Sequence, residues 1–158
     1  MYKLAPEVEE VAKPLIDSYH RHLLEAKVTF VFRDRAWKKG DGRTVLGKAA
    51  KRNELDELLS ERKEDFVIMI AEEKWNDMDD DHRKSLVDHE ICHCGVVVDQ
   101  AGEKKWIIRD HPIQEFPENL ARFEFRRHDI SHLIENPTSA VMAKQSPLRK
   151  IITAAEEV

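Results

Sequence analysis

The chain has 158 residues, of which 36% are charged and 41% hydrophobic, and its formal net charge is −5 at pH 7. This length fits one domain with a core of useful size, and the acidic balance argues against nucleic acid as the main partner. Because no apolar run approaches the length of a membrane span and the first residues lack the apolar segment of a signal peptide, we expect a cytoplasmic protein without a membrane partner.

The first half of the chain predicts a helix and two strands. Apolar residues recur at helical spacing from about 7 to 26, and Pro14 is expected to kink this helix or to separate its first turn. Residues 27–33 alternate β-branched and aromatic side chains, which predicts a strand. The continuous apolar run 66–70 predicts a second strand, covered on both faces.

Between these strands lies a basic segment, residues 38–52. Its cationic residues are set among glycines and comprise Lys38, Lys39, Arg43, Lys48, Lys51 and Arg52. This composition predicts a solvated loop or hairpin. Such a loop can contact phosphates, so nucleic acid remains open as a secondary partner.

Residues 76–94 predict the central helix. Three aspartates at 79–81 crowd its start, where the helix dipole favours negative charge, and Gly95 stands where a C-terminal cap is expected. Its apolar face is expected to consist of Leu86, Val87, Ile91 and Cys94. Glu90 projects onto that face. Because a buried carboxylate is costly unless it is paired or used, Glu90 is a candidate functional residue.

Two histidines on this helix indicate a metal site. His89 and His93 are four residues apart, so they lie one turn apart on one helix face and are placed to bind one Zn²⁺ from the same side. Glu90, next to the first histidine, is placed to take a proton from water at the metal. This is the His-Glu-x-x-His arrangement of zinc peptidases.

The rest of the chain predicts a β-hairpin followed by helical segments. Residues 95–98 and 106–108 form two short apolar runs with Gly102 near the turn between them, and helical spacing resumes after 112. We therefore expect an α+β fold: an N-terminal helix, a short β-sheet, the metal-bearing helix and C-terminal helices. All 158 residues are assigned to a single domain, with 146–158 as a candidate mobile tail.

A catalytic zinc ion usually has three protein ligands, so a third is sought beyond His93. The candidates are His111, Glu115, Glu124, His128 and His132. His111 is favoured because the intervening hairpin would carry the chain out and back to the end of the helix. His128 is its main rival.

Several blocks of the sequence together carry a family resemblance: 65–70 followed by Trp75, 86–93, and 111–117 with 121–123. They are similar to the putative phage metallopeptidases, small zincin-like proteins of phages and bacteria that are distantly similar to SprT-type proteases. The likeness covers roughly residues 5–125. In its last block, Pro112 and Gln114 replace an Asp and a Glu of the family pattern. The resemblance implies a zinc-dependent peptidase acting on a peptide or protein, with His89, His93 and His111 as ligands and Glu90 as base.

Other interpretations remain beside this one. Cys92 and Cys94 allow a structural site of His and Cys ligands, but the chain has no second cysteine pair, and we expect two buried residues without a disulfide. The alternative function is a non-catalytic, zinc-stabilised interaction protein of a phage or bacterium, or a protein associated with nucleic acid through the basic segment. A peptide substrate is expected to pair with an exposed edge strand, either 66–70 or 95–98.

Overall fold

The computed structural model describes residues 1–111 and 117–123, which have an α+β fold. The chain divides into two compact units, Met1–Asp110 and His111–Val158. The assignment of all residues to one domain stays a prediction, and the tail proposed for 146–158 lies outside the described residues. No described helix combines the length and the apolar character that crossing a membrane requires.

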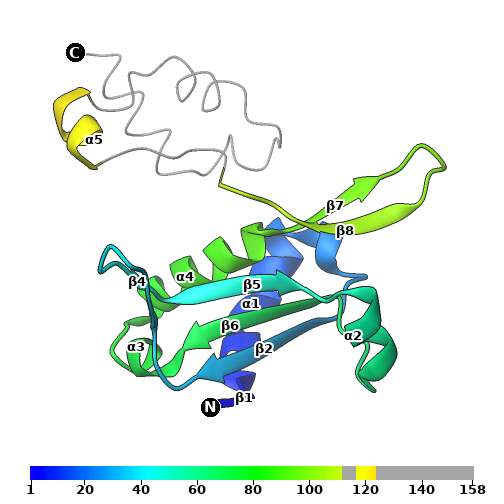
Figure 1. Ribbon diagram of the computed structural model, residues 1–158, viewed down its shortest axis with the longest axis horizontal. Helices are drawn as coiled ribbons and strands as arrows, with labels where there is room; N and C mark the ends of the chain where they lie inside the picture. The colour runs from blue at the N-terminus through cyan, green and yellow to red at the C-terminus, as the bar shows by residue number, and fades with distance from the viewer. Residues whose placement is uncertain (112–116, 124–158) are drawn as a thin grey trace. The chain divides into compact units, whose positions relative to one another are not determined.

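The first unit is organised around a four-stranded sheet with the strand order β1-β2-β6-β5 (Figure 1). Its strands are β1 (Tyr2–Leu4), β2 (Val28–Arg33), β6 (Phe66–Ala71) and β5 (Gly47–Lys51). β2 and β6 form a parallel central pair in which Val28 lies opposite Phe66, whereas β1 and β5 are antiparallel to their neighbours. The strands predicted over 27–33 and 66–70 are confirmed.

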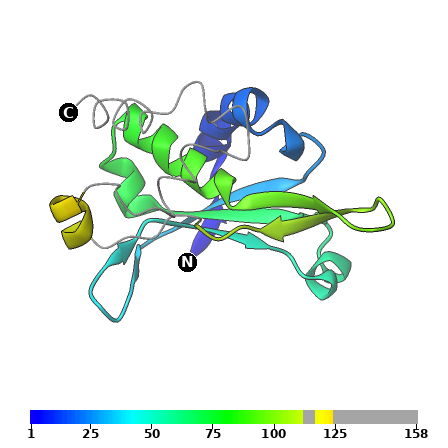
Figure 2. The ribbon, with the colours of Figure 1, turned by 90° about the horizontal axis from the view of Figure 1, so that it is seen from above.

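Helices α1 (Pro6–Tyr19) and α4 (Asp80–Cys92) lie side by side on one face of this sheet (Figure 2). The core between them and the sheet includes Val8, Ala12, Phe30, Phe32, Phe66, Ile68, Ile70, Val87 and Ile91. Burial of these apolar side chains fixes α4 against the sheet, and with it the polar residues that α4 carries. On β6, Val67 and Met69 are partly exposed, so the expectation that both faces are covered is wrong.

The N-terminal helix is shorter than predicted. α1 continues through Pro14 as one helix and ends at Tyr19, and the short 3₁₀-helix η1 (Arg21–Leu23) follows. Between the two, His20 leaves the helical conformation, with φ −129° and ψ 44°. Its ring contacts α4, so a tertiary interaction accompanies the end of the helix.

The basic segment 38–52 is only partly a loop. β3 (Trp37–Lys38) and β4 (Thr44–Val45) form a small hairpin, and the residues that follow form β5, ahead of α2 (Glu54–Leu59). The sequence did not indicate β5 because glycine, alanine and lysine have low intrinsic strand propensity. Its pairing with β6 determines the strand instead.

The helix predicted over 76–94 is α4, which begins later, at Asp80; a separate short helix, α3 (Glu72–Asn76), precedes it. The Asp79 side chain accepts a hydrogen bond of 2.8 Å from the His82 backbone N–H, which caps the start of α4. α4 ends at Cys92, because Cys94 already pairs with Ile108 in a second small sheet.

That sheet is the predicted hairpin, formed by β7 (Cys94–Val98) and β8 (Lys104–Ile108), with Gly102 at φ +80° in the turn. Gly95 lies within β7 and is not a helix cap. An added Cβ there would lie 2.8 Å from Cγ of Arg109, so the glycine makes room for that side chain. In the second unit, the predicted helical segment is α5 (Pro117–Phe123), with proline at its first position.

Candidate metal centre

The last turn of α4 presents His89 and His93 in the arrangement that the spacing predicted. His89 is exposed and belongs to α4, while His93 is the residue after it and keeps helical angles of φ −69° and ψ −24°. Their ring centroids are 5.2 Å apart. The i, i+4 relationship therefore survives although the helix ends one residue before the second histidine.

The imidazole of His93 is held by the strand that returns from the hairpin. Its Nδ1 lies 2.6 Å from the carbonyl oxygen of Arg109. Because a carbonyl oxygen only accepts, Nδ1 carries the proton and donates, so Nε2 is the ring nitrogen that would bind a metal. Sequence analysis missed Arg109, because a main-chain carbonyl contributes no recognisable residue type.

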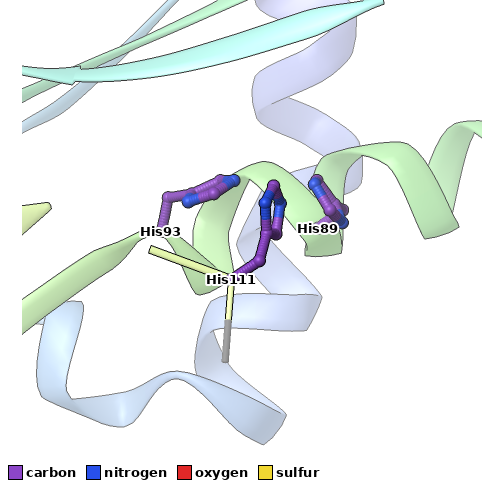
Figure 3. Close-up of side chains that lie close together, drawn as sticks. All are labelled: His89, His93 and His111. Carbon is purple, nitrogen blue, oxygen red and sulfur yellow. The ribbon is translucent and has the colours of Figure 1, made fainter. Parts of the chain in front are cut away.

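His111, the first residue of the second unit, completes a group of three imidazoles. One ring nitrogen from each of His89, His93 and His111 lies within 4.8 Å of the others, and Figure 3 shows the three side chains together beside α4. The other candidate ligands, Glu115, Glu124, His128 and His132, lie outside the described residues. Three neutral imidazoles suit Zn²⁺, which binds three histidines and leaves a fourth position open in some catalytic sites.

Glu90 lies on the neighbouring face of α4 and is buried, with 4% of its surface exposed. Burial raises the pKa of its carboxyl to about 7, and the nearby charge of His93 opposes this rise. A carboxyl group of that pKa exchanges protons near neutral pH.

Gly47, at the start of β5, gives the Glu90 carboxyl its space. A Cβ added at Gly47 would lie only 2.7 Å from Oε1 of Glu90. No backbone strain is involved, because the requirement is the close approach of the carboxyl to the strand. Sequence analysis placed this glycine in the basic segment and saw no role for it, since the contact joins residues 43 positions apart (90 − 47).

Both cysteines are free thiols, in agreement with the expectation of no disulfide. Cys94 is buried in the core as expected, whereas Cys92 is partly exposed. Cys92 therefore does not behave as a simple core residue.

A model of the family described as putative phage metallopeptidase matches residues 1–146. This is longer than the likeness expected over 5–125, and it includes His128 and His132. No curated protein and no solved structure matches the chain.

Proposed function

Because the chain belongs to the putative phage metallopeptidase family, we propose that it is a zinc-dependent peptidase with a zincin-like single domain. His89, His93 and His111 would hold the metal, and Glu90 would act as the general base. The observation that carries this proposal is the grouping of three imidazole nitrogens within 4.8 Å beside a buried carboxyl on the same helix.

The chain's residues divide the chemistry among them. When bound, Zn²⁺ would act as a Lewis acid toward water and the peptide carbonyl. Glu90 would take a proton from the attacking water and return it to the leaving amine nitrogen, a transfer favoured by a pKa of about 7. The hydrogen bond from His93 Nδ1 to Arg109 keeps the ring oriented with Nε2 toward its ligand position.

The substrate would bind as an added strand. Of the two strands expected to offer an edge, β6 is interior, so that expectation is wrong for 66–70. β5 ends the four-stranded sheet and pairs, within the described residues, with no strand other than β6. Because Gly47 of β5 adjoins Glu90, an extended peptide on this edge would run past the base. In β7, the second expected strand, the thiol of Cys94 contacts the backbone carbonyl of Glu90, whereas Gly47 of β5 adjoins the Glu90 carboxyl itself.

The metal assignment is tested by the zinc content of the purified protein. His89→Ala, His93→Ala and His111→Ala should each lower tight zinc binding at this centre, whereas His82→Ala, an exposed histidine of the same helix, should not. His128→Ala tests the rival ligand. Loss of zinc in His128→Ala but not in His111→Ala would reassign the third ligand.

The catalytic assignment is tested by Glu90→Gln, assayed on a complex peptide mixture by mass spectrometry. We expect this variant to retain zinc and lose cleavage by 10²-fold or more, on the order of a general base's contribution. Glu103→Gln, on the exposed hairpin turn, is the control. If the wild type cleaves nothing in the mixture and Glu90→Gln leaves every measured property unchanged, the non-catalytic interaction protein is supported instead.

A further inference from the structure

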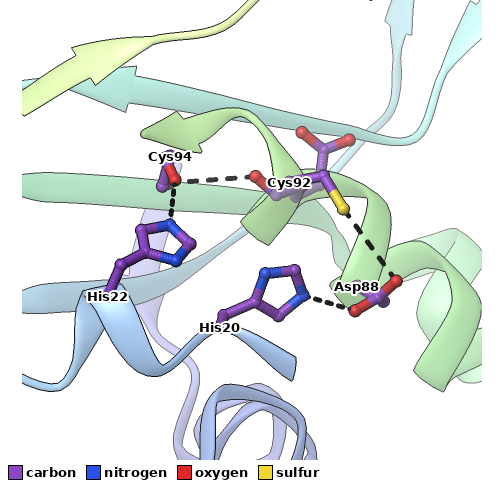
Figure 4. Close-up of polar contacts among 6 residues, drawn as sticks. His20, His22, Asp88, Cys92 and Cys94 are labelled. Carbon is purple, nitrogen blue, oxygen red and sulfur yellow. Dashed lines mark hydrogen bonds and ion pairs between the residues drawn. The ribbon is translucent and has the colours of Figure 1, made fainter. Parts of the chain in front are cut away.

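A second group of metal-ligating side chains lies on another face of α4. His20, between α1 and η1, faces Asp88 and Cys92, which are one turn apart on the helix (Figure 4). The group offers a nitrogen, an oxygen and a sulfur atom, all within 4.8 Å of one another. Neither the proposed peptidase chemistry nor the family match assigns these residues a role.

The contacts within the group are short and come from fixed elements. His20 Nε2 lies 2.6 Å from Oδ1 of Asp88, and Sγ of Cys92 lies 4.0 Å from Oδ2 of the same carboxylate. The His20 side chain is only 10% exposed, whereas that of Asp88 is 42% exposed. The group is therefore anchored on the α1 side and open to solvent on the α4 side.

We propose that His20, Asp88 and Cys92 form a second transition-metal site of the zinc class. Zn²⁺ binds sulfur at about 2.3 Å and nitrogen or oxygen at about 2.0–2.2 Å, so ligand atoms around a tetrahedral ion are about 3.3–3.6 Å apart. The two contacts of 2.6 and 4.0 Å lie on either side of that range. Because the two contacts use different oxygens of the Asp88 carboxylate, binding one ion would require the side chains to rotate.

The donor chemistry also fits. Thiolate and imidazole favour zinc-class ions over Mg²⁺ and Ca²⁺, and the carboxylate completes three protein ligands. Coordination would release the Cys92 thiol proton to solvent. The neighbouring His22 directs its Nε2 to the Cys94 carbonyl, 3.0 Å away. The Asp88 side chain is partly exposed, so solvent would be able to supply a further ligand.

This site is separate from the three-histidine centre. Asp88 directly precedes His89, and Cys92 directly precedes His93. Because consecutive residues are about 100° apart around a helix, Asp88 and Cys92 face a different direction from the two histidines. They share no ligand. An ion held by His20 and α4 would cross-link the end of α1 to the helix that carries the peptidase residues, whether or not the chain is a peptidase.

Cobalt substitution of the full chain tests the proposal, because only a thiolate ligand gives sulfur-to-cobalt charge-transfer absorption. The metal-stripped wild type should bind two Co²⁺ ions and show this absorption. Cys92→Ser, a nearly isosteric change, should lose the absorption and one equivalent of Co²⁺. Cys94→Ser is the matched thiol control and should keep both. Asp88→Asn should lose tight binding of the same equivalent, with folding checked by circular dichroism.

His93→Ala separates this proposal from the proposed function. It should lose the other Co²⁺ ion and keep the sulfur-to-cobalt absorption. A wild type without that absorption, or absorption that persists in Cys92→Ser, would overturn the second site. If the absorption disappears in folded His93→Ala, the claim that the second site binds metal independently of the three-histidine centre is wrong.

Discussion

His93 and Arg109 are joined by two hydrogen bonds that connect the end of α4 to the end of β8. The Arg109 backbone N–H donates to the His93 carbonyl at 2.7 Å, and His93 Nδ1 donates to the Arg109 carbonyl at 2.6 Å. The hairpin β7–β8 thus returns the chain to the helix it left. One strand end both orients a proposed ligand and brings the backbone to within two residues of His111.

Loosening β8 should therefore weaken metal binding without touching a ligand. Trp106 of β8 packs edge-to-face on Phe66 with ring centroids 5.8 Å apart. Trp106→Ala should lower stability by about 1–3 kcal/mol. Because the support of a ligand typically contributes 10–100-fold, it should also lower zinc affinity by about 10-fold. Competition with a chromophoric chelator measures this. Val98→Ala, at a position that is 63% exposed on the same hairpin, is the control and should change neither quantity.

Gly47→Ala should damage the site through overpacking. The new Cβ would lie 2.7 Å from Oε1 of Glu90, so the carboxyl or β5 must shift. We expect a loss of about 1–3 kcal/mol in urea unfolding and a fall in kcat, because the base is displaced. Gly40→Ala is the matched control, since its Cβ would meet nothing within 4 Å. Equal effects of the two changes would contradict the packing role of Gly47.

The metal-free protein should lose stability as pH rises from about 4.5 to about 7. The pKa of Glu90 is raised from 4.5 to about 7 in the folded state, so between these values the folded protein binds the extra proton. The contribution of this proton to the free energy of unfolding is fully present below pH 4.5 and is lost as the pH rises through 7. Its upper limit is about 3 kcal/mol. Urea unfolding in chelator at several pH values measures this loss.

The useful quantity is the difference in the free energy of unfolding between wild type and Glu90→Gln, because it isolates the contribution of this carboxyl. Glu103→Gln should follow the wild type, because its side chain is exposed. A Glu90→Gln profile parallel to the wild type would show that Glu90 does not carry the pH dependence.

Zinc should raise the melting temperature in a concentration-dependent way. An ion at a thousand times its dissociation constant stabilises the folded state by about 4 kcal/mol. His89→Ala should reduce the rise, whereas His82→Ala should not. Cys92→Ser should reduce it independently, so the double variant His89→Ala with Cys92→Ser should lose it. A rise that persists in the double variant would place the zinc elsewhere.

The parts of the site that follow from helical periodicity could be predicted from the sequence. The i, i+4 histidines and the buried position of Glu90 depend only on neighbouring residues of α4, and both are confirmed in their geometry. The contribution of Gly47 could not be predicted, because it depends on where an edge strand of low intrinsic propensity pairs. The hydrogen bond from His93 to the Arg109 carbonyl could not be predicted either, since every residue has a backbone carbonyl.

The fold shows the same division. The β-branched and aromatic residues of β2 and β6 indicate strands in the sequence, whereas β5 is a strand because it pairs with β6. The end of α4 was placed too late because Cys94 is apolar and continues the helical pattern. Its pairing with Ile108 is a long-range contact that local spacing does not contain.

The parallel pairing of β2 with β6 constrains the order in which the protein can form during synthesis. Val28 meets Phe66, 38 positions later (66 − 28), so the centre of the sheet cannot close while only the first strands have emerged from the ribosome. Pairings of such sequence separation form slowly compared with local helices. α4 and the hairpin are translated later still. The residues of the proposed metal centre therefore leave the ribosome only after every strand of the four-stranded sheet has been synthesised.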